Sequence, residues 1–221
     1  MTSVALLFVG AVLLINGLTF CGLLDGRAGV PANVLVGALL LAAAAASVVE
    51  AGGLTGQTRI PLYSAAGFVL FSFTYLGVAG QSLLRTDGRS LGVYCGWSAL
   101  VAAVLAAVNM YEAVRMGWLW LAWTVLFFAF ALALLTDRAH LGRAAGVLSI
   151  WLAVTSATLP GLLMIDGAWD RTPVWAVAAA QLLGVIAYGS LSLTPRRRPR
   201  AGAKDRPGGE HVLSAAPGSP G

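Results

Sequence analysis

Long apolar runs alternate with short polar breaks along almost the whole chain. Seven runs reach the roughly 20 mostly apolar residues that a helix needs to cross a bilayer. They cover approximately residues 2–24, 32–52, 62–84, 91–111, 116–136, 144–165 and 173–193. Breaks are as short as "RTDGRS" and "YEAVR", so neighbouring helices must run antiparallel in one bundle. The pattern predicts an all-α integral membrane protein whose residues 1–194 form a seven-helix bundle.

Composition agrees with this class, since 58% of residues are hydrophobic and only 10% are charged. Soluble domains carry about 25% charged residues. Six of the fourteen basic residues follow the seventh run, four of them in "RRRPR". Residues 195–221 are otherwise rich in Pro, Gly and Ser, which predicts a disordered, basic cytoplasmic tail beside anionic lipid rather than a nucleic-acid site. Cys21 and Cys95 fall in apolar runs and are interpreted as packing residues.

The distribution of basic residues predicts the orientation. Eleven of the fourteen Lys and Arg fall on one side, and only Arg59, Arg115 and Arg171 fall on the other. The positive-inside rule then places the amino terminus outside and the tail in the cytoplasm. The first run is too long for a signal-peptide core and is expected to stay in the mature protein. Thirteen Arg against one Lys, with abundant Ala and Gly, indicates a GC-rich bacterial genome and hence a bacterial cell membrane.

Ionisable side chains are missing from the middle of the predicted spans. Every acidic residue outside the tail lies at a span end or in a loop, and the two histidines are His140, in a predicted cytoplasmic loop, and His211, in the tail. A proton-coupled carrier is therefore disfavoured, because it needs an ionisable relay at depth. No cluster supports a metal or hydrolytic site, so neither an enzyme nor a cofactor is expected.

Aromatic and uncharged polar side chains do occur at depth, and helical spacing groups them into stripes. The stripes are Val9, Leu13 and Asn16 in the first run, Phe71 and Tyr75 in the third, and Trp120, Trp123 and Phe127 in the fifth. Aromatic residues along one face can line a narrow slot that admits a flat molecule. The same spacing is typical of a packed aromatic core, so spacing alone leaves both interpretations open.

Five segments occur in an order that is recognisable as a family pattern. They are "LLFVGAVLLINGL", "NVLVGAL", "LFSFTYLGVA", "WLAWTVLFF" and "TSATLPGLLM", spread over about residues 1–165. Together they resemble the AmiS/UreI family of small-amide transporters and proton-gated urea channels. The resemblance implies a six-helix, barrel-like protomer with a pore through its own middle, packed into a ring-shaped homohexamer. It also implies a pore lining, which consists of Val9, Leu13, Phe71, Tyr75, Trp120, Trp123, Leu126 and Phe127.

Three features depart from the family pattern. Leu152 stands where the family commonly has Glu or Gln, so Thr155 or Ser156 would have to supply the polar group. Phe127 stands where the urea channel has a second pore Trp, which removes an indole N–H donor. The outward loops lack the histidines of acid-gated members, so acid gating is not expected.

The sequence therefore predicts a passive transmembrane channel for small uncharged amides, either urea or short-chain aliphatic amides. The residues expected to contact the solute are Val9, Leu13, Asn16, Phe71, Tyr75, Trp120, Trp123, Leu126, Phe127, Thr155 and Ser156. The alternative is a non-conducting multi-pass membrane protein that binds a partner or small ligand, with the same aromatic residues as its core. The expected partners are membrane lipid, a neutral solute and further copies of the chain, and spacing assigns no task to the seventh helix.

Overall fold

The computed structural model describes residues 2–52 and 59–194, which are helical almost throughout. The helices are α1 (Thr2–Phe20), α2 (Val30–Glu50), α3 (Arg59–Leu84), α4 (Arg89–Glu112), α5 (Val114–Thr136), α6 (Ala139–Leu152), α7 (Leu159–Ile165) and α8 (Val174–Leu193). Short 3₁₀ turns lie at Gly26–Gly29 and Trp169–Arg171. Seven helical spans in the described residues are long and apolar enough to cross a membrane, which confirms the predicted fold class. The predicted tail, residues 195–221, lies outside the described residues.

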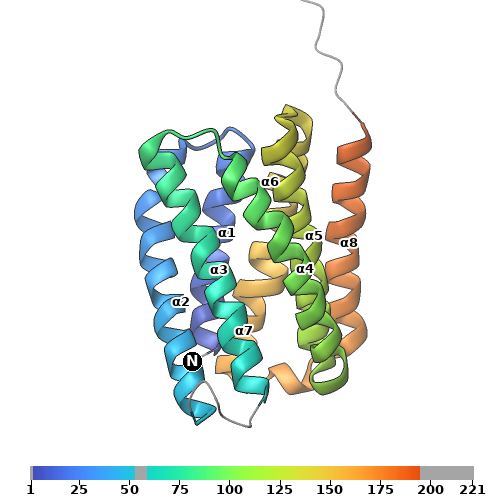
Figure 1. Cartoon of the computed structure of the whole chain (residues 1–221). Coiled ribbons are helices and arrows are strands. Elements are labelled where there is room, and N and C mark those ends of the chain that lie inside the picture. Colours follow the sequence, from blue (N-terminus) through green and yellow to red (C-terminus); the bar gives the residue numbers. More distant parts are fainter. Residues whose placement is uncertain (1, 53–58, 195–221) are drawn as a thin grey trace, which may run out of the picture.

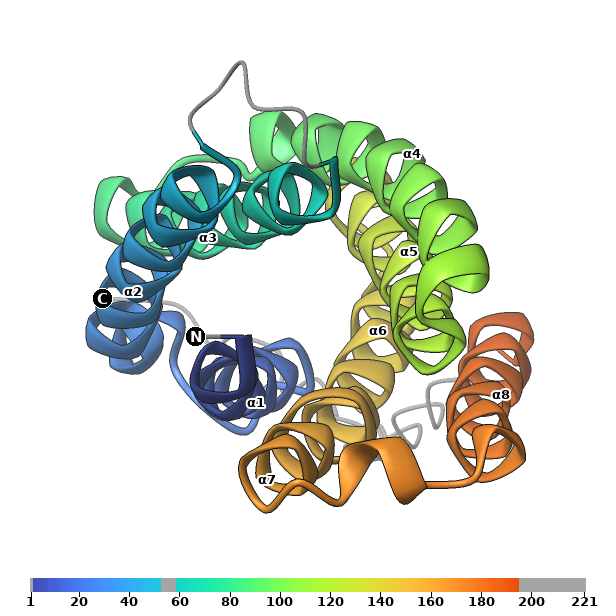
Figure 2. The same ribbon diagram turned by 90° about the horizontal axis from the view of Figure 1, so that it is seen from below.

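Six spans form a closed ring, and the seventh stands outside it. From α1 to α6 each helix packs against the next, and α6 returns to α1. The view along the ring in Figure 2 shows this order, and Figure 1 shows the same helices standing upright side by side. Within the described residues α8 packs on the outer side of the ring, against α5, α6 and the residues that follow α6. The fold is therefore a six-helix ring with one external helix.

The outside of the ring is apolar, as a lipid-facing surface must be. Leu35, Leu100 and Trp175 are each more than 70% exposed, yet all three lie within spans. Inside, small residues let the helices approach closely. A Cβ on Gly17 of α1, for example, would come within 2.7 Å of the Ile150 side chain of α6. The ring is thus sealed by close packing on the inside and covered by large apolar side chains on the outside.

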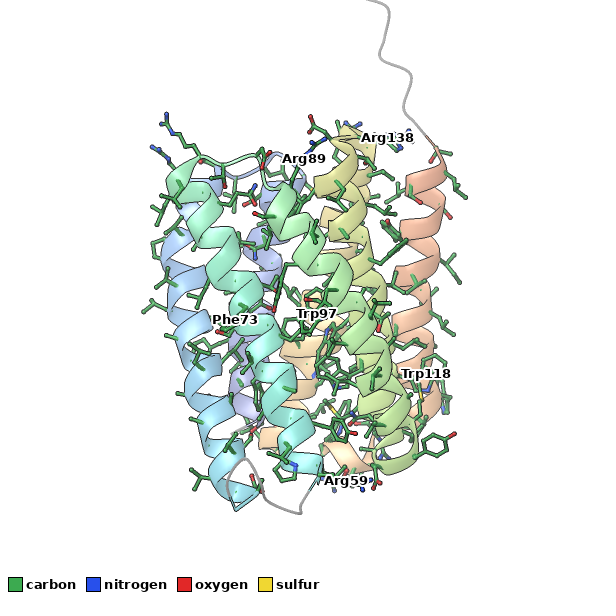
Figure 3. All side chains as sticks on the ribbon, in the orientation of Figure 1. Arg59, Phe73, Arg89, Trp97, Trp118 and Arg138 are labelled. Atoms are coloured by element: carbon green, nitrogen blue, oxygen red, sulfur yellow. The ribbon has the colours of Figure 1, made fainter. Side chains whose placement is uncertain are left out.

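Arginines lie at the two ends of the bundle, as expected for residues in the connections between spans. Figure 3 shows Arg89 and Arg138 at one end and Arg59 at the other. The connections between neighbouring helices can be very short, since a single residue, Ala113, separates α4 from α5. Asp137, in the left-handed conformation with φ 52°, ends α5.

Three predicted span boundaries were wrong by several residues. α3 begins at Arg59 rather than residue 62, and α6 begins at Ala139 rather than residue 144. His140 therefore lies in the first turn of α6 and not in a loop. Polar residues extend these helices beyond the apolar run because a helix end at the membrane surface presents them to water. α1 instead ends early, at Phe20, because Gly22 adopts φ 75°, the left-handed conformation that commonly ends a helix.

The sixth span is not the continuous α-helix that its apolar run predicted. Between α6 and α7 lies a π-helical stretch, Ala153–Thr158, called here the π segment. In it the N–H of Leu159 donates to the carbonyl of Val154, five residues back. In that register the next donor would be residue 160, but Pro160 has no N–H. Such π segments occur frequently at functional sites.

Candidate functional site

A cavity of about 230 Å³ lies inside the ring. Sixteen residues line it, contributed by α1 to α5, α7 and the α4–α5 connection. Leu6 near the start of α1, Tyr63 near the start of α3 and Asn109 near the end of α4 place it in the half of the ring nearer the amino terminus. Since a water molecule occupies about 30 Å³ in the liquid, this space suits a molecule of a few heavy atoms.

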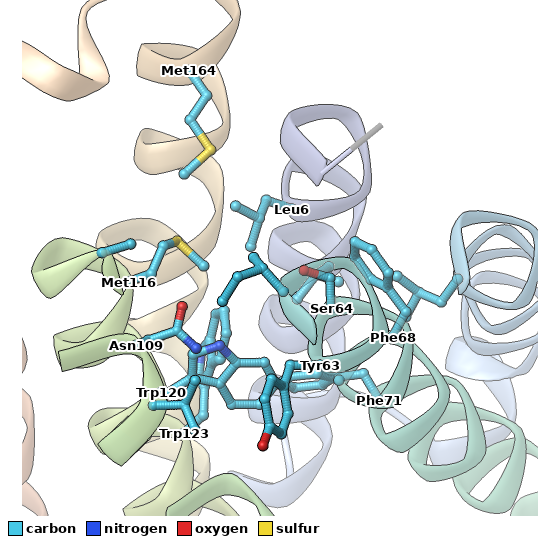
Figure 4. Close-up of a pocket in the computed structure, with 16 residues that line it drawn as sticks. Leu6, Tyr63, Ser64, Phe68, Phe71, Asn109, Met116, Trp120, Trp123 and Met164 are labelled. Atoms are coloured by element: carbon cyan, nitrogen blue, oxygen red, sulfur yellow. The ribbon is translucent and has the colours of Figure 1, made fainter. Parts of the chain in front are cut away.

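The wall of the cavity is mostly apolar and uncharged. Its polar side chains are Tyr63, Ser64, Asn109 and the indoles of Trp120 and Trp123. No Asp, Glu, Lys, Arg or His is among the described residues that line it. Figure 4 shows the aromatic side chains and aliphatic ones such as Leu6 directed toward the same space. The site can therefore hold a neutral solute but offers no charge to an ion.

Aromatic rings close the inner end of the cavity. Phe71 lies at their centre, with ring centroids 5.0 Å from Trp123, 5.1 Å from Phe127, and 6.0 Å from both Trp120 and Tyr75. The Phe71–Trp123 pair meets edge to face at 82°, an orientation that aromatic quadrupoles favour by about 0.5–1.5 kcal/mol. We call these five residues the aromatic plug.

The inner part of the plug and the residues next to it fill the ring with side chains. Tyr75 lies one helical turn past Phe71 and Phe127 one turn past Trp123, both toward the cytoplasmic end predicted from charge. Tyr75, Phe127 and Leu13 are each only 1% exposed, as is Leu126. The cavity consequently ends at the plug.

The Tyr75 hydroxyl is a polar group within the plug. It is buried and has no hydrogen-bond partner among the described residues. A buried hydroxyl without a partner costs about 1–3 kcal/mol, so such a group in a folded protein calls for an explanation. A solute or water molecule entering the plug would satisfy it.

The Trp123 indole is held by the sixth span. Its N–H donates to Oγ of Ser156 at 2.9 Å, and the Ser156 hydroxyl donates to the carbonyl of Leu152 at 2.6 Å. Leu152 therefore contributes its backbone rather than its side chain to this contact. Ser156 is the member of the predicted Thr155 or Ser156 pair that meets an expected pore residue.

Thr155 lies on the other side of the same helical turn. Its hydroxyl donates to the carbonyl of Trp151, and its own carbonyl accepts from Gln181 of α8. Thr155 does not line the cavity, and its carbonyl meets α8 outside the ring, so its place differs from the sequence prediction. In a π segment the direction of each side chain is rotated from α-helical spacing, so the sequence did not separate the two residues.

Asn16 also differs from its predicted place, because it pairs with another side chain. Its amide exchanges two hydrogen bonds with Asn33, of 2.9 and 3.0 Å, and Asn33 also donates to the carbonyl of Gly29. Asn16 does not line the cavity, and this buried pair instead joins α1 to α2. The role of Asn33 was not predicted, although this residue lies within a family segment.

This pairing makes a stability prediction. Replacing Asn16 by leucine leaves the Asn33 amide without its partner, so the variant should lose about 1–3 kcal/mol of stability. The double variant Asn16→Leu/Asn33→Leu should regain part of this loss, because it buries no unpaired amide. Thermal unfolding in one detergent compares the three proteins. An Asn16→Leu protein with wild-type stability but no solute flux would instead make Asn16 a solute contact.

The outer half of the cavity wall was not among the predicted site residues. Ser64, Gly67 and Phe68 precede Phe71 on one face of α3, and Met116 precedes Trp120 by one turn of α5. The signal was present, since these residues continue the predicted stripes by one or two turns.

The fold and the site together define a class of protein. A ring of membrane-spanning helices encloses a neutral, solute-sized cavity with an aromatic floor, which is the arrangement of a multi-pass membrane channel or transporter. Residues 1–168 match the family described as AmiS/UreI family transporter. The chain belongs to this family and is a multi-pass protein of the cell membrane.

Known relatives agree in sequence and in structure. An amidate-substrate transporter, so named, from Mycolicibacterium smegmatis is 32% identical, with 87% of this chain and 88% of that protein covered. A transporter named AmiS2 from Rhodococcus erythropolis is 33% identical, with 90% and 98% covered. The crystal structure of the Helicobacter pylori urea channel is similar with a TM-score of 0.66 and 26% identity, over 76% of this chain and 99% of that one. A closed-state structure of that channel gives a TM-score of 0.67 at 24% identity.

These matches differ in how far they extend along the chain. Residues 1–168 are 168 of 221, or 76% of the chain, and α8 begins only at Val174. The alignments with the two transporters cover 87% and 90% of this chain, so their similarity continues past residue 168. The family match, in contrast, ends before α8.

Proposed function

We propose that the protein is a passive pore for small uncharged amides and that it prefers short-chain aliphatic amides to urea. The observation that carries this proposal is the cavity, which is neutral, solute-sized and bounded by the aromatic plug. Selectivity then comes from width, ring faces and a few hydrogen-bonding groups. The solute enters from the side that bears the amino terminus, which the charge count places outside.

The chemistry of the wall supports aliphatic amides in particular. Urea carries two amino groups, and each needs hydrogen-bond acceptors once it leaves water. Asn109 uses an amide N–H on the carbonyl of Leu105, and most of the other wall residues, such as Leu40 and Met164, are apolar. An aliphatic amide has one amino group and one apolar end, so it gives up fewer hydrogen bonds with water on entering this cavity.

Flux into proteoliposomes tests the proposal. Stopped-flow light scattering should show faster entry of acetamide and propionamide than into empty vesicles, with urea slower than either. If none of the three solutes enters protein-containing vesicles faster than empty ones, the proposed pore function is wrong. A stoichiometric partner recovered together with no flux would then favour a non-conducting binding protein.

The Tyr75 hydroxyl provides a sharper test. Tyr75→Phe removes only the oxygen, and because the hydroxyl has no partner among the described residues, stability should be unchanged or higher. Acetamide flux should fall roughly two- to tenfold, the value of one lost hydrogen bond of about 0.5–1.5 kcal/mol to the solute. Parallel thermal unfolding and vesicle flux assays measure both effects.

A matched control is available on α8. The Tyr188 hydroxyl is also buried without a partner among the described residues, but α8 lies outside the ring. Tyr188→Phe should leave flux at the wild-type level. Equal losses of flux in the two variants, or none in Tyr75→Phe, would remove Tyr75 from the solute path.

We also propose that protomers assemble into a ring-shaped homohexamer, each with its own pore, and that the protein has no catalytic activity. The family resemblance supports the hexamer, and the apolar outer face of the ring supplies surface for contacts between protomers and with lipid. Native mass spectrometry of the purified protein measures the number of subunits.

A further inference from the structure

The sixth span contains a gap in its backbone hydrogen bonding. In the π segment Leu159 donates to the carbonyl of Val154, so the carbonyl of Thr155 would next accept from residue 160. Pro160 has no N–H to donate. A carbonyl within the hydrocarbon region must find a donor in the protein, since no water is available there. The donor for Thr155 therefore has to come from another helix.

α8 supplies that donor. Nε2 of Gln181 lies 3.2 Å from the Thr155 carbonyl oxygen, and the Gln181 side chain is only 2% exposed. One turn earlier in the sixth span, the Trp151 indole N–H donates to the carbonyl of Ala180 at 2.8 Å. Gly184 packs against the same indole, because a Cβ there would come within 2.9 Å of its Nε1. Three contacts thus fix α8 to the segment that runs from Trp151 to Thr155.

The segment held by α8 leads directly to the plug. Ser156 follows Thr155 in the chain, and its Oγ accepts the Trp123 indole N–H. Trp123 in turn meets Phe71 edge to face at 5.0 Å. A rotation of the Thr155 peptide therefore moves the hydrogen-bond acceptor of a residue in the cavity wall.

We infer that α8 braces the pore from outside: Gln181 and Gly184 are positioning residues that hold the π segment so that Ser156 orients Trp123. The effect of this brace on solute selectivity rests on the proposed function. Its effect on the Trp123 hydrogen bond does not. The inference assigns a task to a helix that lies beyond the family match and outside the ring.

The full-length protein tests the brace with two pairs of variants. Gly184→Val places side-chain atoms against Trp151, whereas a Cβ at Gly189 on the same helix meets nothing within 4 Å, which makes Gly189→Val the control. Gln181→Met removes the amide donor and keeps an unbranched side chain of similar length. Ser190→Ala removes a hydroxyl that, within the described part of the chain, bonds the carbonyl of Ile186 in its own helix.

The readout is the indole ¹H–¹⁵N resonance of Trp123 in lipid nanodiscs, identified by its absence in Trp123→Phe. It should shift in Gly184→Val and Gln181→Met and stay in place in Gly189→Val and Ser190→Ala. The permeability ratio of acetamide to butyramide should fall by roughly twofold or more in the first pair only, a typical size for coupling through packed side chains.

A wild-type Trp123 resonance in folded Gln181→Met and Gly184→Val would overturn the inference. If Gly184→Val does not fold, the Trp123 resonance of Gln181→Met decides the question alone, since Gln181→Met adds no volume against Trp151. Absence of amide flux in the wild-type protein would end the proposed function, while the position of the Trp123 resonance would still decide whether α8 braces the π segment.

Discussion

Replacing Phe127 by alanine is expected to raise acetamide permeability about tenfold. The ring of Phe127 is 1% exposed and lies 5.1 Å from that of Phe71, where the cavity ends. Passage requires the plug to open, and each aromatic contact opposes opening by about 0.5–1.5 kcal/mol. Removing about 1.4 kcal/mol from that barrier gives a factor of ten. Butyramide flux should rise more than acetamide flux, because the widened plug no longer discriminates by size.

The neighbouring residue supplies the control for this variant. Phe128 has the same side chain on the same helix but is 53% exposed on the outer face. Phe128→Ala should leave both flux and size selectivity unchanged. Buried Phe→Ala changes cost about 3–5 kcal/mol in protein cores, so Phe127→Leu serves as a milder variant if Phe127→Ala is unstable. Unchanged flux in a folded Phe127 variant would show that the solute route lies elsewhere.

Gly67→Leu is expected to have the opposite effect and to lower acetamide flux about tenfold or more. Such a decrease corresponds to at least about 1.4 kcal/mol added to the barrier for passage. Gly67 lines the cavity, and a Cβ there would come within 2.6 Å of the Trp120 ring. The added side chain must fill the cavity or push Trp120 into it. Stopped-flow measurements on vesicles with matched protein content compare the variant with the wild type.

Gly80 on the same helix provides the matched control. A Cβ at Gly80 meets nothing within 4 Å, and this residue does not line the cavity. Gly80→Leu should therefore conduct like the wild type. If Gly67→Leu conducts normally as well, the cavity is not part of the solute path, and the proposed function loses the observation that carries it.

Much of the site could be predicted because its residues repeat with helical spacing. Phe71 and Tyr75 were placed on one face of a helix, and Trp120, Trp123 and Phe127 on one face of another. Both stripes meet in the aromatic plug. Apolar run length likewise predicted the seven spans, since each must cross the same thickness of hydrocarbon.

The rest depended on contacts that spacing does not encode. Asn16 has the position of a pore residue in its stripe, but its amide pairs with Asn33 on the next helix. Thr155 and Ser156 were both predicted to contact the solute, but they lie in the π segment Ala153–Thr158, where α-helical spacing no longer applies. The place of α8 was equally unpredictable, since its apolar residues suit lipid, a ring helix or an external helix alike.

The uncharged wall of the cavity has a thermodynamic consequence for the cell. The described lining residues include no Asp, Glu, Lys, Arg or His. In the proposed passive pore for uncharged amides, solute passage moves no proton and no net charge. Membrane voltage and the proton gradient then do no work on the solute. Such a pore only equalises amide concentration across the membrane, so sustained uptake lasts only while a reaction inside the cell consumes the amide.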